Sequence, residues 1–282
     1  MNPIILDDLK FISKNMNINI FDKTTVLITG ATSFIGSYII RTLMYLNRTA
    51  ESFNCTVISL CRNEKKALKL FSEFIDDERF QIIVQDVTTP LSIEANVNFI
   101  FHAASPASTA EHRLYPVETL TSNLMGTHNV LAFAKKCSDF KGLLYFSSGA
   151  VYGNTEPITH LISENDYYPI DPLDCHSFYA VAKRAGESIC SAYWHEYKVP
   201  SKIIRISHTY GPGINLNDGH VYSDFVKNIL SNSDLIIKGD GQQYRPFTYI
   251  SDCITAIFKI VEKGKLGKAY NMANNGAYYS IC

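Results

Sequence analysis

The stretch Val26-Leu-Ile-Thr-Gly-Ala-Thr-Ser-Phe-Ile-Gly36 decides the fold of this chain. Its first four residues form a continuous apolar and β-branched run, which is typical of a strand buried in a parallel sheet. A turn with Gly30 and Gly36 follows, and apolar residues then recur at helical spacing from Ile35 to Leu46. A strand, a glycine turn and a helix in this order place unpaired backbone N–H groups where a pyrophosphate can bind. The glycine spacing alone is weak evidence, because many such turns only connect a strand to a helix.

The alternation of strand and helix continues as far as Ile206. Strands are expected at Val26–Thr29, Thr56–Leu60, Gln81–Val84, Val97–Phe101, Gly142–Phe146 and Lys202–Ile206. Helices are expected near 37–49, 64–75, 116–137 and 177–198. This order predicts an α/β fold with a doubly wound parallel sheet, whose ligands bind outside the carboxyl ends of the strands. Glycine or polar residues follow five of these ends: Gly30, Asp86, His102, Ser148 and His208.

Both ends of the chain depart from this alternation. Residues 1–20 are expected to form a helical extension, and 154–176 are irregular and rich in proline, aspartate and tyrosine. The elements expected after residue 210 are a helix at His220–Ser231, a short strand at Leu235–Lys238, a helix near 252–263 and a strand at Ala269–Met272. We therefore expect a main domain over residues 21–210 and a small C-terminal lobe over residues 211–282, to which 154–176 contribute.

Composition narrows the possible classes of protein. The chain has 282 residues, of which 46% are hydrophobic, and its formal net charge is −1. Without a basic stripe it is not expected to bind nucleic acid. No apolar run approaches the roughly 20 residues of a membrane-spanning helix, and the first residues lack the order of a signal peptide. Seven scattered cysteines without a C-x-x-C pair fit a reduced, cytoplasmic protein and do not indicate a metal site.

Three residues form a candidate catalytic set. Tyr179 and Lys183 stand four residues apart in a predicted helix and so share one helix face. An ammonium beside a phenol lowers the pKa of the phenol, so Tyr179 is expected to take a proton from an alcohol. Ser148 is expected to hydrogen-bond the same substrate oxygen, although Ser147 could exchange roles with it. Deprotonation of an alcohol is half of its oxidation, and a ligand at the glycine turn would accept the hydride.

Four motifs follow one another in a fixed order: Thr29–Gly36, Ser147–Gly153, Tyr179–Lys183 and Arg205–Pro212. Together they resemble the extended short-chain dehydrogenase/reductase family, and more narrowly its nucleotide-sugar epimerase/dehydratase branch. Within that branch, the segments 102–108, 218–225 and 245–252 look most like UDP-glucuronate decarboxylases. The resemblance begins near residue 24 and reaches the end of the chain.

This resemblance implies a Rossmann-like domain with a small C-terminal substrate-binding lobe. It also implies an NAD cofactor, a nucleotide-sugar substrate, a role in polysaccharide biosynthesis and a homodimer joined through the helices near 116–137 and 177–198. The residues that would hold the pyrophosphate of NAD are Gly30, Ser33, Phe34, Ile35 and Gly36.

The resemblance assigns the other site residues as well. Asp86 and Val87 would flank the adenine, and Asn123 matches a helix asparagine of the family. The ribose and nicotinamide side would be lined by Ala103, Ala104 and Ser105. The catalytic residues would be Ser148, Tyr179 and Lys183, of which Tyr179 and Lys183 also contact the cofactor. The substrate would be held by His208, His220, Val221 and Arg245, with Arg245 on the diphosphate. We expect His102 and His208 to serve as packing or hydrogen-bonding residues more than as acid or base groups.

Three departures from the family pattern leave the reaction open. NAD users of the family commonly end the second strand with an acidic residue, whereas this chain has Cys61 and Arg62. A guanidinium there suits the 2′-phosphate of NADP, unless Arg62 is a solvated loop residue. Gly149-Ala150 stands where sugar 4,6-dehydratases carry an acid/base pair, and decarboxylases usually keep a glutamate at Ala150. The chain also ends at Cys282, sooner than is usual in the family.

Two classes of function follow. The first is an enzyme that oxidises a nucleotide sugar transiently at C4, with decarboxylation of UDP-glucuronate as the best expectation and 4-epimerisation or 4-ketoreduction as alternatives. The second is a cofactor-binding remnant without turnover. The intact Ser148, Tyr179 and Lys183 favour the enzyme, whereas the early end of the chain favours the remnant.

Overall fold

A seven-stranded sheet in the order β10-β6-β5-β4-β1-β2-β3 forms the centre of the computed structural model. The structure describes residues 2–106, 108, 112, 114–155, 161–237, 241, 244–274, 276 and 278–280. The strands are β1 Thr24–Thr29, β2 Cys55–Cys61, β3 Phe80–Val84, β4 Phe99–His102, β5 Gly142–Ser148, β6 Ser201–Ile206 and β10 Ala269–Met272. Every neighbouring pair is parallel, which confirms the predicted α/β sheet. The order reverses between β1 and β4, so a ligand crevice is expected at their carboxyl ends.

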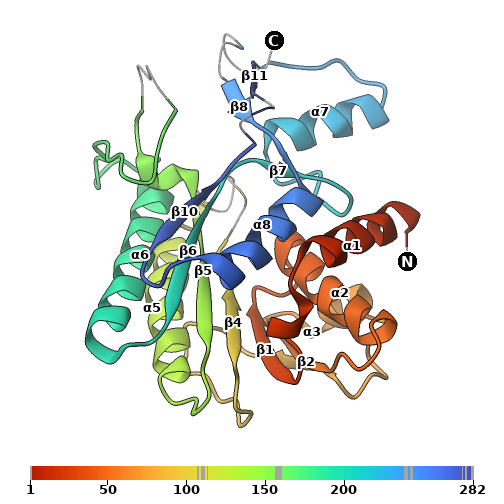
Figure 1. Cartoon of the computed structure of the whole chain (residues 1–282). Coiled ribbons are helices and arrows are strands. Elements are labelled where there is room, and N and C mark those ends of the chain that lie inside the picture. Colours follow the sequence, from red (N-terminus) through yellow and green to blue (C-terminus); the bar gives the residue numbers. More distant parts are fainter. Residues whose placement is uncertain are drawn as a thin grey trace.

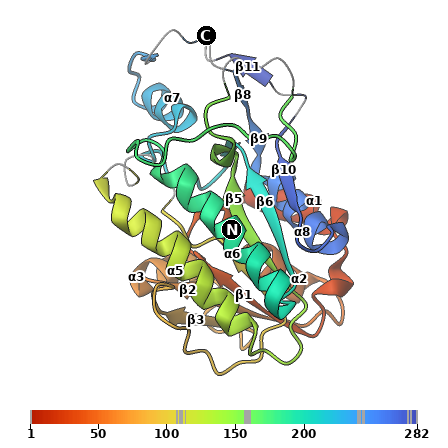
Figure 2. The ribbon, with the colours of Figure 1, turned by 90° about the vertical axis from the view of Figure 1, so that its left-hand side faces the viewer.

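Helices cover both faces of this sheet (Figures 1 and 2). Helices α5 (Pro116–Ala134) and α6 (Phe178–Tyr197) pack on one face. The other face carries α2 (Phe34–Thr49), α3 (Glu64–Leu70) and α8 (Ile250–Lys263). The expected N-terminal extension is α1 (Pro3–Asn15) with a 3-10 turn at Ile18–Ile20, and α1 packs against α2 and α8. Within the described parts of the chain, none of the helices is long and apolar enough to cross a bilayer.

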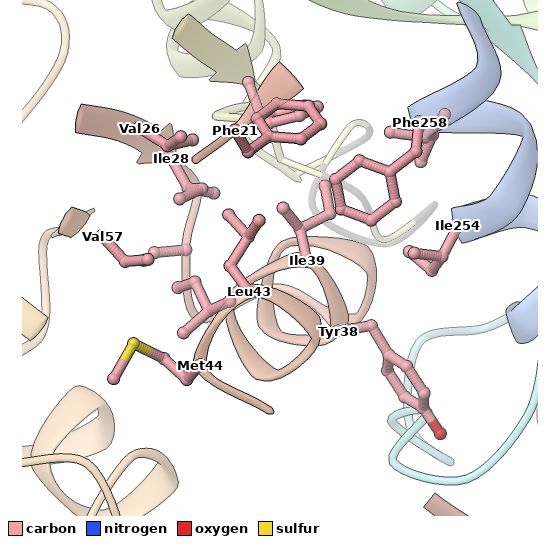
Figure 3. Packing of buried hydrophobic residues seen from close by; sticks show 14 of the residues in the cluster. Phe21, Val26, Ile28, Tyr38, Ile39, Leu43, Met44, Val57, Ile254 and Phe258 are labelled. Carbon is pink, nitrogen blue, oxygen red and sulfur yellow. The ribbon is translucent and has the colours of Figure 1, made fainter. Parts of the chain in front are cut away.

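The hydrophobic core beside β1 fixes the positions of the strand, the glycine turn and the helix that follow one another from Val26 onward. Ile39 and Leu43 lie one turn apart on α2 and share a face. That face packs toward Val26 and Ile28 of β1, while Phe258 closes the cluster from α8 (Figure 3). Each of these side chains is 0–2% exposed, and burying one stabilises the fold by about 1.5–3 kcal/mol. The core therefore holds the strand, the turn and the helix in a fixed relation.

The remaining elements lie beyond the carboxyl ends of the strands (Figure 1). They are β7 Thr209–Tyr210, α7 Val221–Leu230, β8 Tyr244–Pro246, β9 Thr248–Tyr249 and β11 Tyr278–Ser280, with β7 paired to β9 and β8 to β11. The predicted strand at Leu235–Lys238 is wrong for 235–237, which are exposed and unpaired, and Lys238 lies outside the described residues. Because α8 and β10 belong to the layers of the main sheet, a domain boundary at residue 210 stays a proposal.

Candidate active site

Ser148, Tyr179 and Lys183 come together where the end of β5 meets the start of α6. The hydroxyl of Ser148, the last residue of β5, lies near the phenol of Tyr179 in the first turn of α6 and favours its charged form. Lys183, one turn further on, is 3% exposed, and its ammonium donates to the carbonyl oxygen of Phe146 at 2.7 Å. The same ammonium lies 5.7 Å from the centre of the Tyr179 ring. The expected set is thus assembled on one helix face and one strand end.

The electrostatics of this set differ from the expectation. Burial raises the pKa of Tyr179 above its ordinary value, and the Ser148 hydrogen bond opposes this only in part. Burial also lowers the pKa of Lys183 to about 7, against the opposing effect of Glu187. The prediction that Lys183 depresses the pKa of Tyr179 is therefore wrong for this structure. Its physical reason is that desolvation outweighs an ammonium that is bonded to a backbone carbonyl.

His112 is a residue of this site that the sequence analysis missed. Its imidazole stacks on the ring of Tyr179, with the ring centroids 4.0 Å apart and an interplanar angle of 12°. The ring nitrogen Nε2 lies 2.9 Å from the carbonyl oxygen of Pro106, and the backbone N–H donates to Ser108 at 3.1 Å. A histidine in the connection after β4 is a weak sequence signal, because only the fold brings it to α6.

The turn after β1 lies close against the backbone that follows β4. Gly30 has φ +65°, and a Cβ there would lie 2.5 Å from the carbonyl oxygen of Ala103. Glycine is therefore the residue that fits. Ser33 caps α2, with its hydroxyl accepting from the N–H of Gly36 at 3.1 Å. The first turn of α2 leaves N–H groups without helical acceptors, which suits an anion. The other two predicted pyrophosphate contacts, Phe34 and Ile35, are in this first turn.

The segment after β4 connects the glycine turn to α5. The N–H of Ala104 donates to the hydroxyl of Thr29 at 3.3 Å. Asn123, which is 1% exposed, donates from its amide to the hydroxyl of Ser105 at 3.1 Å and to the carbonyl of Thr119 at 2.8 Å. Its carbonyl oxygen Oδ1 is buried without a hydrogen-bond partner in the described structure. An unpaired buried acceptor is costly, so a ligand that donates a hydrogen bond fits here.

His102 is a buried structural residue in this geometry. Its Nδ1 lies 2.7 Å from the hydroxyl of Thr29, and its Nε2 lies 3.1 Å from that of Thr127. Burial, with a smaller effect of Lys183, lowers the pKa of His102 to about 3. A neutral ring with both nitrogens bonded joins β1, β4 and α5.

The predicted substrate residues gather beyond the sheet. The rings of His208 and His220 lie 6.4 Å apart, and Val221 begins α7 beside them. Burial lowers the pKa of His208 to about 4, and the nearby Arg245 and His220 add to this effect. His208 is therefore neutral near pH 7, and Arg245 of β8 is the permanent cation among these four residues.

A model of the NAD dependent epimerase/dehydratase family matches residues 26–273, which is most of the chain. This chain belongs to that family. The match confirms the resemblance and the fold class, and it agrees with the expected enzyme class and with NAD as the cofactor.

Relatives within and near the family are nucleotide-sugar enzymes. UDP-glucuronic acid decarboxylase 6 of Arabidopsis thaliana is 32% identical over 279 residues, covering 99% of this chain and 75% of the relative. UDP-glucuronic acid decarboxylase 1 of Xenopus tropicalis is 32% identical, covering 94% of this chain and 58% of the relative. A solved UDP-glucuronic acid 4-epimerase from Bacillus cereus, in complex with UDP-glucuronic acid and NAD, has a TM-score of 0.73 and 25% identity. That likeness covers 91% of this chain and 79% of the epimerase.

The adenosine end of the family's cofactor site carries an unusual charge pattern here. Cys61 ends β2 and is 4% exposed, and burial raises the pKa of its thiol, which stays neutral. Arg62 follows it with 70% of its side chain exposed, 3.8 Å from the carboxylate of Asp86 after β3. Val87 is buried against Gly126 of α5. The exposed cation of Arg62 and the carboxylate of Asp86 therefore lie together at this edge of the sheet.

At the reaction end of the site, Ala150 stands where the resemblance to decarboxylases predicts a glutamate. This residue lies in the 3-10 turn Gly149–Tyr152, and its N–H donates to the hydroxyl of Ser148 at 3.2 Å. Its methyl group can neither give nor take a proton. The structure thus puts an inert side chain next to the predicted catalytic hydroxyl.

Proposed function

We propose that this protein is an NAD(P)-dependent enzyme that modifies UDP-glucuronate through transient oxidation at C4. The observation that carries the proposal is that Ser148, Tyr179 and Lys183 meet where β5 ends and α6 begins, at the same sheet edge as the turn at Gly30. The named relatives support the substrate, because both the decarboxylases and the 4-epimerase take UDP-glucuronic acid by name. The curated relatives support decarboxylation as the first candidate reaction.

In this mechanism Tyr179 takes the proton of the sugar 4-hydroxyl, and Ser148 hydrogen-bonds the same oxygen as its charge changes. NAD, when bound, supplies the acceptor for the C4 hydride and later its donor. Burial raises the pKa of Tyr179, so the phenol is protonated before the substrate binds. It therefore has to lose this proton before it can act as the base. The ammonium of Lys183 is the group that favours the phenolate once it turns toward the phenol.

The 4-ketone explains the loss of the carboxyl group. With a carboxylate at C6, the oxidised sugar is a β-keto acid. The C5–C6 bond breaks, carbon dioxide leaves, and the electron pair passes to C5 and the C4 carbonyl as an enolate. A proton is then added to C5, and the return of hydride to C4 completes a cycle in which the cofactor is regenerated.

The structure of the turn after β5 favours a second candidate, 4-epimerisation. Ala150 offers no acid for protonation at C5, whereas epimerisation needs none: the keto-sugar turns over and receives the hydride on its other face. A 4-ketoreductase, the third alternative, would consume NAD(P)H instead of regenerating it.

One incubation separates these reactions. Purified protein is incubated with UDP-glucuronate, UDP-glucose and a 4-keto-6-deoxy nucleotide sugar, once with NAD and once with NAD(P)H, and the products are separated by chromatography and mass. Loss of carbon dioxide selects decarboxylation, unchanged mass with altered retention selects epimerisation, and a gain of two hydrogens with NAD(P)H selects reduction. A folded protein that binds NAD and transforms none of the three overturns the proposal and supports the remnant.

We also propose that the protein works as a cytoplasmic homodimer through α5 and α6. The resemblance supports this pairing, and on α5 Val117 is 70% and Met125 52% exposed, so both are open to a partner helix. The six cysteines in the described part of the chain are free, in keeping with a reducing compartment. Light scattering of the wild type and Met125→Glu tests the dimer. A wild-type monomer would contradict it.

A further inference from the structure

Glu187 lies one helical turn beyond Lys183 and joins α6 to two neighbouring strands. Its Oε1 accepts from the hydroxyl of Ser147 at 2.5 Å and from Nε of Arg205 at 3.0 Å, and its Oε2 accepts from Nη2 of Arg205 at 2.8 Å. Ser147 of β5 and Arg205 of β6 stand opposite each other in the sheet. The side chains of Arg205 and Glu187 are only 8% and 13% exposed. A two-pronged, buried pair with a third hydrogen bond fixes the carboxylate in one position.

Consecutive residues of β5 therefore hold successive turns of α6. Phe146 accepts from Lys183, Ser147 donates to Glu187, and Ser148 lies near Tyr179 and influences its pKa. Phe146 and Ser148 face the candidate catalytic residues of α6. Ser147, which lies between them on β5, bonds the carboxylate of the ion pair. A displacement of reacting groups by about 1 Å can cost about a hundredfold in rate. The contact of Ser147 with Glu187 therefore affects the rate by fixing the positions of Lys183 and Tyr179.

Glu187 is also the carboxylate among the groups that face the ammonium of Lys183. The others, from β4, β5 and α6, are His102, Tyr145, Tyr179 and Cys190. Burial lowers the pKa of the imidazole and raises those of the two phenols and the thiol, so all four are uncharged at pH 7. The charge of Glu187 raises the pKa of Lys183 against the effect of burial.

We propose that Glu187 is a positioning residue of this site. It fixes α6 against β5 and β6, and it provides the counter-charge that keeps Lys183 cationic for the reaction. The effect on rate rests on the proposed function, whereas the effect on Lys183 can be measured without any substrate.

The test compares the titration of Lys183 in the wild type and in Glu187→Gln, which keeps the shape of the side chain and removes its charge. Protein with ¹³C-labelled lysine is followed by NMR against pH, and Lys183→Met assigns the signal. We expect Lys183 to lose its proton at a pH lower by roughly one unit in Glu187→Gln. The alkaline limb of the kcat profile is expected to move with it, while KM stays unchanged. Ser147→Ala, which keeps the charge, is expected to titrate like the wild type.

Two further variants separate this role from a purely structural one. Glu187→Gln/Arg205→Gln removes both buried charges, so no unpaired guanidinium remains if the single variant folds poorly. A smaller downward shift is expected, because losing the guanidinium charge offsets part of the effect of losing the carboxylate. Glu73→Gln breaks the partly buried pair with Arg41, 2.9 Å apart on the far side of the fold, and should leave Lys183 unchanged. Equal titration of Lys183 in the wild type, Glu187→Gln and the double variant overturns the proposal, even if the protein transforms no sugar.

Discussion

The ammonium of Lys183 donates to the carbonyl oxygen of Phe146 at 2.7 Å, while the ring of the neighbouring Tyr179 lies 5.7 Å from it. In this arrangement the lysine ties α6 to β5, and its charge acts on the phenol only through space. The desolvation of Tyr179 then outweighs that charge. For Tyr179 to act as a base, its pKa therefore has to fall when cofactor and substrate bind.

We predict that Tyr179 titrates above its ordinary range, beyond about pH 10, in the protein without cofactor. The hydrogen bond from Ser148 favours the phenolate, so Ser148→Ala is expected to raise the titration further. NMR of protein with ¹³C-labelled tyrosine, with Tyr179→Phe for assignment, measures both. Titration of Tyr179 near neutral pH without a ligand would contradict the electrostatics described above.

Lys183→Met is expected to lower kcat by about a hundredfold or more without loss of stability. Burial lowers the pKa of Lys183 to about 7, well below the ordinary value for lysine. Keeping the charged ammonium buried therefore costs free energy of folding, and methionine removes this cost. Denaturant unfolding at pH 6 checks the stability. Lys202→Met is the matched control, because Lys202 also donates to a buried backbone carbonyl, that of Val261, but away from the site. A similar loss of rate in both variants would contradict a specific role for Lys183.

His102 predicts a pH dependence of stability with a defined sign. Its pKa in the fold is about 3, below the 6.5 of free histidine, so the unfolded chain binds the proton first as the pH falls. The contribution of His102 to the free energy of unfolding is fully present above pH 6.5 and decreases as the pH falls toward 3. At pH 4 the free energy of unfolding is lower by about 3 kcal/mol. His102→Gln, whose amide can bond Thr29 and Thr127, should lose less stability between pH 7 and pH 4. Parallel curves for the two proteins would show that His102 is not the group responsible.

The stack of His112 on Tyr179 predicts that ring contact matters more than the imidazole nitrogens. His112→Phe keeps the stack and should retain most of the rate, whereas His112→Ala should lose up to about tenfold in kcat. His128→Ala is the control, since His128 also contacts a tyrosine, Tyr193, in the packing of α5 on α6. If phenylalanine and alanine at position 112 reduce the rate equally, the stacking argument fails.

Arg62 predicts a selective effect on the phosphorylated cofactor. Its exposed guanidinium directly follows Cys61, which ends β2 where NAD users of the family commonly have an acidic residue, so a 2′-phosphate would be its natural partner. Arg62→Ala is expected to weaken NADPH binding at least about tenfold and NADH binding little, as measured by fluorescence titration. Lys65→Ala, which removes a neighbouring exposed cation, should change neither strongly. An equal change for both cofactors in Arg62→Ala would identify Arg62 as a solvated loop residue.

Most of the main sheet could be predicted because its signals are local. The run before Gly30 and the helical spacing after it belong to one short segment, and the spacing of Tyr179 and Lys183 needs only a helix. Pairing between distant strands has no such signal. The joining of β10 to β6 and the unpaired residues 235–237 were therefore open to error.

The sequence predicted that Ser148, Tyr179 and Lys183 would lie together, but it did not predict the electrostatics of the site or the position of His112. Spacing indicates that Lys183 shares a face with Tyr179, but the direction of its ammonium depends on where the Phe146 carbonyl lies. Likewise, the position of His112 over the ring and of Glu187 between two strands follows from tertiary packing. Burial, the largest cause of the pKa shifts of Tyr179, Lys183 and His102, is a property of the folded chain.

The central claim is that C4 of the sugar is oxidised and reduced again with Tyr179 as the base. UDP-glucuronate carrying deuterium at C4 tests it most directly, with the NAD-loaded wild type and Tyr179→Phe compared side by side. We predict a slower turnover of the deuterated sugar, a product that keeps the label at C4, and no turnover by Tyr179→Phe. Label lost to the solvent, an unchanged sugar with folded and NAD-loaded protein, or equal turnover by Tyr179→Phe would contradict the claim.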